Sequence, residues 1–300
     1  MLTGCVHGDE LNGMGIIREL LYDQPPKLVC GTLICVPVVN VYGLEHHMRY
    51  LPDRRDLNRD FPGSTTGSLS SRLAHVVFEE VVKKCDMLID FHSAAVRRTN
   101  YPNIRADLSN PETRALARSF GCELIVNGKG PVGSLRRATL AAGIPSIILE
   151  AGEVWKIEPG VVNVGVRGVM NVLKTLNMVR GTVTPPRFQT QISKTTWVRA
   201  ERGGTLSFNI NPGDLIEKGQ VLASNYNIFG DERRQILAPV DGIILGMTTM
   251  PVVKPGDAIF HIAHLSRSTL RRIGKKMSEG SNQDLYKQIH SDLSTNVHHV

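Results

Sequence analysis

Short apolar runs and segments of helical spacing alternate along residues 1–178. Apolar residues that recur every three or four positions predict helices over residues 10–21, 69–81, 134–142 and 161–176, and a further helix that starts at Asn110. Runs rich in β-branched residues predict buried strands over residues 31–39, 87–91, 123–126 and 145–149. This alternation predicts an α/β domain with a largely parallel sheet, in which ligands bind at the carboxyl ends of the strands.

The pattern changes after residue 181, where short apolar runs are separated by turns about ten residues apart. Such spacing predicts an all-β segment, and Pro-Gly-Asp turns at 212–214 and 255–257 suggest an internal two-fold repeat. Residues 265–300 are polar without a dense apolar face, so we expect a frayed helix or disorder there. We therefore divide the chain into an α/β domain at 1–180, a β-rich domain at 181–264 and a polar tail at 265–300.

The composition narrows the class of protein. No run of 18 apolar residues could form a transmembrane helix, and the first residues lack the basic and apolar segments of a signal peptide. The five cysteines stand singly without a CxxC pair, which favours reduced thiols and a cytoplasmic location. The net charge of +7 suits a small anionic substrate. The chain has no basic run interleaved with aromatic residues, which argues against a nucleic-acid partner.

The first residues of the chain resemble the end of a strand. The apolar run at 2–6 leads directly into the loop that contains His7, so we expect the natural reading frame or an oligomeric partner to supply an edge strand before it.

Two histidines and a carboxylate form a candidate metal site. His7 and Glu10 lie three positions apart before the first helix, and His92 follows the strand at 87–91. Two imidazoles and one carboxylate leave a fourth position for water, as a catalytic zinc site requires. A carboxylate could accept a hydrogen bond from the imidazole nitrogen that does not bind the metal. The candidates are Asp90, which lies on the same strand face as His92, or else Asp9. The alternative is an ordinary turn histidine and a glutamate in the first turn of a helix.

Two further features could assist such a metal. Glu150 is the only charged residue in 146–151, so it either forms a salt bridge or acts as a general base, with Glu153 as the alternative base. The loop at 49–63 is rich in Arg and Asp. It could be a solvated loop, but Asn58 and Arg59 beside a metal would grip a substrate carboxylate, since guanidinium binds carboxylate bidentately.

Four motifs in order resemble the succinylglutamate desuccinylase/aspartoacylase family of the zinc carboxypeptidase clan. They are His7-Gly8-Asp9-Glu10, Asp56-Leu57-Asn58-Arg59-Asp60-Phe61-Pro62-Gly63, Asp90-Phe91-His92 and Leu149-Glu150-Ala151-Gly152. The resemblance implies an α/β fold with a zinc-carboxypeptidase-like mixed sheet flanked by helices. It also implies zinc-dependent hydrolysis of an amide bond in an N-acyl amino acid or a similar small carboxylate-bearing amide.

The same resemblance assigns roles to individual residues. It implies one zinc ion per chain on His7, Glu10 and His92, with Glu150 as the general base that acts on zinc-bound water. It implies that Asn58 and Arg59 bind the substrate carboxylate. It also implies that Arg49, or alternatively Arg54 or Arg55, polarises the carbonyl, and that Arg137 or its neighbour Arg136 is a further substrate-binding arginine. We expect a small carboxylate-bearing substrate and neither nucleic acid nor membrane as a partner; a homo-oligomer is compatible with the sequence.

Residues 200–264 are similar to the small all-β, biotinyl/lipoyl-like barrel often found at the C-terminus of this family. The hairpin between Gly246 and Val253 has no lysine to carry a prosthetic group, so we expect neither biotin nor lipoyl there. The barrel would then cap the site or mediate assembly. Two other readings of the chain are a metallocarboxypeptidase that acts on peptides and a non-catalytic binding or assembly protein that keeps the fold.

Overall fold

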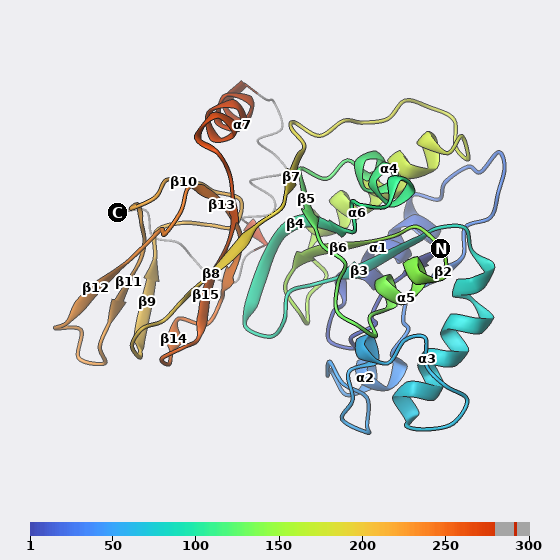
Figure 1. Cartoon of the computed structure of the whole chain (residues 1–300), viewed down its shortest axis with the longest axis horizontal. Coiled ribbons are helices and arrows are strands. Elements are labelled where there is room, and N and C mark those ends of the chain that lie inside the picture. The colour runs from blue at the N-terminus through green and yellow to red at the C-terminus, as the bar shows by residue number, and fades with distance from the viewer. Residues whose placement is uncertain (280–290, 293–300) are drawn as a thin grey trace.

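The computed structural model describes residues 1–279 and 291–292 (Figure 1). Its main feature is an 11-stranded mixed sheet whose principal path runs β2-β1-β3-β6-β4-β13-β15-β8. The first four strands of this path are parallel, and β4 then runs antiparallel to β6. The four parallel strands are β2 (Cys35–Val36), β1 (Leu2–Thr3), β3 (Leu88–His92) and β6 (Ser146–Gly152), and the antiparallel strand is β4 (Arg98–Ala106). A branch from β4 contains β5 (Leu124–Asn127) and β7 (Thr190–Ile192).

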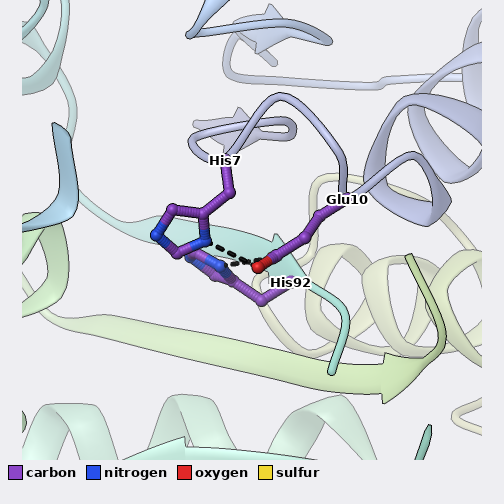
Figure 2. A group of neighbouring side chains, drawn as sticks. All are labelled: His7, Glu10 and His92. Carbon is purple, nitrogen blue, oxygen red and sulfur yellow. Dashed lines mark hydrogen bonds and ion pairs between the residues drawn. The ribbon is translucent and has the colours of Figure 1, made fainter. Parts of the chain in front are cut away.

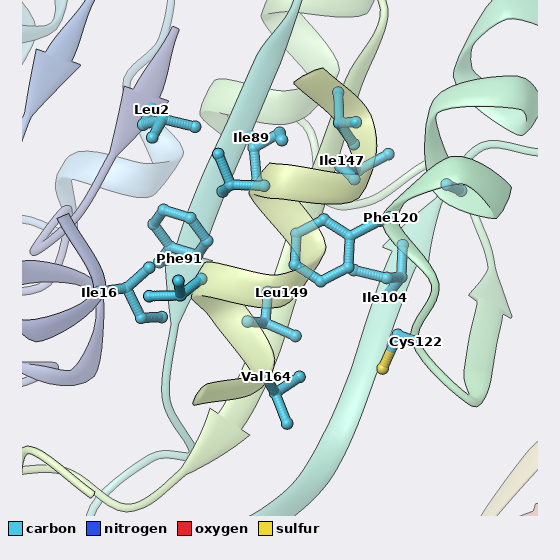
Figure 3. Close-up of a cluster of buried hydrophobic side chains, with 14 of the residues drawn as sticks. Leu2, Ile16, Ile89, Phe91, Ile104, Phe120, Cys122, Ile147, Leu149 and Val164 are labelled. Atoms are coloured by element: carbon cyan, nitrogen blue, oxygen red, sulfur yellow. The ribbon is translucent and has the colours of Figure 1, made fainter. Parts of the chain in front are cut away.

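Helices cover both faces of the N-terminal part of the sheet (Figure 1). One face packs against α1 (Asn12–Arg18), its π-helical continuation at Glu19–Asp23, α4 (Pro111–Phe120) and α6 (Pro159–Thr175). The other packs against α3 (Leu69–Glu80) and α5 (Leu135–Ala141), near α2 (Val41–Glu45) and short 3-10 turns at Leu57–Arg59 and Val82–Lys84. Figure 3 shows the first of these two cores.

Alternation along β3 explains how one strand serves both cores. Ile89 and Phe91 point into the core under α1 and α6, whereas Leu88 points into the core under α3 and α5. Asp90 and His92 share the side of Leu88, so the strand carries polar groups to its carboxyl end on the α3 and α5 side. This end is where the polar motif residues gather.

The C-terminal part is all-β up to residue 264, as predicted. Its strands are β8 (Thr195–Arg199), β9 (Gly204–Phe208), β10 (Leu215–Ile216), β11 (Val221–Tyr226), β12 (Arg233–Leu237), β13 (Gly242–Thr248), β14 (Val252–Val253) and β15 (Ala258–His264). Four of them form a second sheet in the order β12-β11-β9-β14, which shares an apolar core with β13 and β15. Because β13 pairs with β4, the C-terminal strands also extend the main sheet. The barrel-like domain and its boundaries at 180 and 264 stay predictions.

Two expectations need correction, and one strand was missed. Within 31–39 only Cys35–Val36 is a strand, and it is half-buried because it lies at the sheet edge rather than inside it. β4 was not predicted, since its sequence is polar and contains Pro102. Residues 267–279 form α7 (Arg267–Glu279), a packed helix rather than a frayed one, because Leu270 and Ile273 are buried against the β strands.

The rest of the predicted tail, 280–290 and 293–300, lies outside the described residues. Within the described part of the chain, no helix has both the length and the apolarity needed to cross a bilayer.

Candidate metal centre and active site

The loop after β1 brings His7 and Glu10 onto one point. Glu10 N donates a hydrogen bond to His7 O at 3.2 Å, which folds the intervening residues into a turn. A Cβ on Gly8 would overlap the backbone of Gly43 in α2, so the turn packs this closely only with glycine there. The turn therefore sets the positions of the His7 and Glu10 side chains before α1 begins.

Glu10 lies between the two histidines (Figure 2). Its Oε1 is 2.6 Å from His7 Nδ1, and its Oε2 is 2.8 Å from His92 Nδ1 and accepts a hydrogen bond from Ser93 N at 3.0 Å. Ligand atoms of His7, Glu10 and His92 all lie within 4.8 Å of one another, and all three residues are buried. The structure thus brings together the three residues that the sequence predicted as metal ligands, although His92 lies 82 residues after Glu10 in the chain.

Carboxylates hold both imidazoles from outside. His92 Nε2 is 2.8 Å from Asp90 Oδ2, and Thr3 Oγ1 donates to Asp90 Oδ1 at 2.7 Å. His7 Nε2 is 3.2 Å from Asp56 Oδ1. Asp90 is therefore the outer partner of His92, whereas Asp9 Oδ1 is buried without a hydrogen-bond partner among the described residues.

The carboxylate of Glu10 stays ionised in this cluster. Burial alone would raise the pKa of Glu10, but the charges of His7 and His92 outweigh it and hold the pKa well below its usual range. Each imidazole turns Nδ1 inward and has its Nε2 beside a carboxylate, as metal-binding histidines commonly do. Two nitrogens and a carboxylate oxygen at this spacing fit a divalent zinc ion with an open coordination position.

A cavity of about 520 Å³ lies beside the cluster. It is lined mainly by polar side chains, among them His7, Glu10, Arg49, Asn58, Arg59, His92, Arg98, Asn100, Arg105, Arg136, Glu150 and Trp197. Glu150 stands on β6 directly beside His92 on β3 in the parallel register, so both side chains lie on the same side of the sheet. Glu153 is buried, pairs with Lys156 at 3.3 Å and is not among the lining residues.

The arginines predicted for the site divide into two groups. Arg49 and Arg59 line the cavity, whereas Arg54 and Arg55 do not. Arg49 Nη2 is 2.9 Å from Asp56 Oδ2, and its Nη1 is 3.4 Å from Glu10 Oε1, so Arg49 lies at the edge of the His–Glu–His cluster.

Arg136 lines the cavity and Arg137 does not, because neighbours on a helix point in different directions. Arg137 is exposed and donates to Gly130 O at 3.2 Å. Arg136 is buried, donates to Gly128 O at 2.8 Å, and has its pKa lowered to about 10 by burial and by Arg105. Of the two positions that the sequence left open, the cavity therefore holds Arg136.

Comparison with known proteins identifies the family. Residues 1–176 match the succinylglutamate desuccinylase/aspartoacylase catalytic domain. The chain belongs to the succinylglutamate desuccinylase/aspartoacylase family. It is similar to N-α-acetyl-L-2,4-diaminobutyric acid deacetylase of Halomonas elongata, with 28% identity over 287 residues that cover 89% of this chain and 82% of the relative.

Solved structures agree with this assignment. A succinylglutamate desuccinylase/aspartoacylase from Rhodobacter sphaeroides is 28% identical with a TM-score of 0.77, over 88% of this chain and 85% of that one. The product-bound ectoine utilization protein EutE from Ruegeria pomeroyi shares the fold, with 24% identity and a TM-score of 0.78 over 88% and 84% of the two chains. The family resemblance predicted from the four motifs is confirmed, and its deacylase members indicate amide hydrolase activity.

Several residues lining the cavity of this family member were missed by sequence reasoning. Arg98, Asn100 and Arg105 come from β4, a strand that the pattern did not predict. Trp197 comes from β8 in the C-terminal part, where it stacks on His261 with ring centroids 4.2 Å apart, and the Arg98 guanidinium lies 5.0 Å from its ring centroid. No local motif marks these residues, because long-range strand pairing brings them to the cavity.

Proposed function

We propose that this protein hydrolyses the amide bond of an N-acyl amino acid, or of a similar small carboxylate-bearing amide, with zinc held by His7, Glu10 and His92. The observation that carries the proposal is that Glu150 lines the same cavity as the His–Glu–His cluster, in register beside His92. The Halomonas relative, which removes the acetyl group from an acetylated amino acid, supports the same chemistry.

The chemistry needs a water activated next to the amide carbonyl. Zinc in this centre would polarise that carbonyl and acidify the water. Glu150 accepts the proton as the water oxygen forms its bond to the carbonyl carbon, and returns a proton to the amine nitrogen as the C–N bond breaks. Arg49, held by Asp56, would stabilise the oxyanion with its guanidinium.

Asn58 and Arg59 are the candidates for binding the substrate carboxylate. Asn58 Oδ1 accepts a hydrogen bond from Leu135 N at 2.8 Å, which orients its Nδ2 as the donor. Arg59 anchors Nη1 on Asn58 O at 2.7 Å and keeps 47% of its side chain exposed, so part of the guanidinium is accessible to a ligand. Arg59, Arg98 and Arg136 add positive charge to the lining, which favours an anionic substrate.

A Glu150→Gln variant tests the proposal. The amide keeps the size of the side chain but cannot take the proton, so kcat should fall by about 10²–10⁴-fold while zinc content stays unchanged. The matched control is Glu153→Gln, which changes a nearby glutamate that does not line the cavity and should leave kcat near that of the wild type. Wild-type turnover by Glu150→Gln would remove Glu150 from its role.

The peptidase alternative makes a different prediction. A carboxypeptidase would cleave short peptides faster than N-acetyl or N-succinyl amino acids. Assays of both substrate sets with the zinc-loaded protein separate the two, and the deacylase proposal expects the acylated amino acids to have the higher kcat/KM. Failure to cleave either set, together with failure to take up zinc, would favour a non-catalytic protein.

A further inference from the structure

We infer that Asn100 is a positioning residue for Glu150, and that Gly246 of the C-terminal β segment provides the space in which it acts. The inference rests on the proposed role of Glu150 as the base. Asn100 is buried, lines the cavity and comes from β4, the strand that joins the N-terminal and C-terminal parts of the main sheet.

Asn100 and Glu150 meet on one side of the sheet. Asn100 lies opposite Gly152 in the antiparallel pair of β4 and β6, and Glu150 is two positions before Gly152. Their side chains therefore share a face as diagonal neighbours. Asn100 Nδ2 donates a hydrogen bond to Glu150 Oε2 at 3.1 Å, while the other carboxylate oxygen, Oε1, lies 3.7 Å from Arg105 Nε.

The backbone of Glu150 is held from the same strand. Asn103 is fully buried, and its Nδ2 donates to Glu150 O at 3.2 Å and to Tyr101 O at 2.8 Å. The register of β4 against β6 shifts between Asn100 and Asn103, around Pro102. This irregularity lets one asparagine hold the carboxylate and the other hold the main chain of Glu150.

Gly246 on β13 makes room for Asn100 from the other side. Gly246 pairs with Asn100 across β13 and β4, and a Cβ at position 246 would lie 2.5 Å from Asn100 Oδ1. Any larger residue would have to displace the Asn100 side chain or the nearby Thr99 carbonyl. The C-terminal strands thus shape the site at the point where the base is held.

Without the Asn100 amide, the side-chain contact of the Glu150 carboxylate that remains among the described residues is the Arg105 guanidinium, and that contact is long at 3.7 Å. The carboxylate would then lose its fixed orientation toward the substrate. A misplacement of about 1 Å at a reacting group can lower the rate about 10²-fold. Binding of the substrate carboxylate by Asn58 and Arg59 would be unaffected, so the effect should fall on kcat rather than on KM.

The test compares Asn100→Ala and Asn100→Asp with the wild type in the zinc-loaded full chain. Asn100→Ala should lower kcat about 10–100-fold with KM within about twofold and zinc content unchanged. Asn100→Asp keeps the shape but cannot donate when ionised and repels Glu150, so its kcat should fall at least as far. The matched control is Asn225→Ala, a similarly buried asparagine in the C-terminal sheet that donates to Arg202 O and does not line the cavity.

The outcomes separate this inference from the proposed function. Wild-type kcat in Asn100→Ala, or restored kcat in Asn100→Asp, would overturn the positioning role even if Glu150→Gln is inactive. An active Glu150→Gln would instead overturn the proposed function. Should Asn100→Ala fail to fold, shown by loss of its thermal unfolding transition, Asn100→Asp retains the shape of the side chain and still decides the question.

Discussion

Asp90→Asn is the substitution that most sharply probes how the metal centre is held. Asp90 is fully buried between His92 Nε2, at 2.8 Å, and Thr3 Oγ1, at 2.7 Å. If His92 binds metal through Nδ1, its Nε2 carries a proton and needs an acceptor. An asparagine can turn its Oδ1 toward His92 and its Nδ2 toward Thr3 Oγ1, so the variant keeps both hydrogen bonds and loses only the negative charge.

The magnitude follows from that loss of charge. Hydrogen bonds to charged groups contribute about 1.5–3 kcal/mol, against about 0.5–1.5 kcal/mol for neutral ones. The difference is about 1–1.5 kcal/mol, which corresponds to about a tenfold weaker zinc affinity. This agrees with the lower end of the roughly 10–100-fold loss usual when an outer carboxylate is removed from a metal-binding histidine.

The assay is a zinc competition titration of metal-stripped protein against a chromophoric chelator. The matched control is Asp107→Asn, which neutralises an aspartate that accepts a hydrogen bond from Ser109 and does not itself line the cavity, and which should leave zinc affinity unchanged. Zinc affinity in Asp90→Asn within about twofold of the wild type, or an equal loss in Asp107→Asn, would refute the reasoning that Asp90 supports the metal through His92.

Two further predictions concern a lining residue of the cavity and a histidine that stacks on its Trp197. Arg59→Ala should raise KM about 10–100-fold for substrates with a free carboxylate, because it removes a charge-assisted hydrogen bond. Steady-state kinetics with the matching carboxamide substrate should show little change in KM. An equal rise in KM for both substrates would count against carboxylate binding by Arg59. His261 has its pKa lowered from 6.5 to about 4 by burial and by Arg105 and Arg98. Between pH 4 and 6.5 this histidine is therefore protonated in the unfolded chain more than in the folded protein. The free energy of unfolding should fall by about 3 kcal/mol as the pH drops from 6.5 to 4. His261→Phe keeps an aromatic ring against Trp197 and should reduce the dependence of the unfolding temperature on pH between 4 and 6.5. The same pH dependence as in the wild type would show that other groups titrate in this range.

The clustering of His7, Glu10 and His92 could be predicted from sequence because these residues follow or end short, strongly apolar runs. His7 follows the first such run, and His92 and Glu150 end two others, so the rule that parallel strands end at one edge places them together. The spacing of two between Asp90 and His92 on a strand made Asp90 a candidate outer partner, with Asp9 as the alternative. Local periodicity and the rule for strand ends proposed these residues, and the family resemblance assigned their roles.

The rest of the cavity could not be predicted, because it depends on pairing between distant strands. β4 is polar and contains Pro102, so it carried no strand signal, yet it brings Arg98, Asn100 and Arg105 to the cavity. Trp197 reaches the same cavity through β8, at the far end of the sheet path that runs from β4 through β13 and β15. Sequence spacing also could not choose between Arg136 and Arg137, since the direction of α5 relative to the sheet decides which of them faces inward.

The central claim is that His7, Glu10 and His92 together hold one zinc ion. Anomalous diffraction at the zinc edge from crystals of zinc-loaded protein tests it most directly. The account predicts one anomalous peak per chain, about 2.0–2.2 Å from His7 Nδ1, His92 Nδ1 and a Glu10 carboxylate oxygen. A zinc peak elsewhere, or no peak between these three side chains, would contradict it.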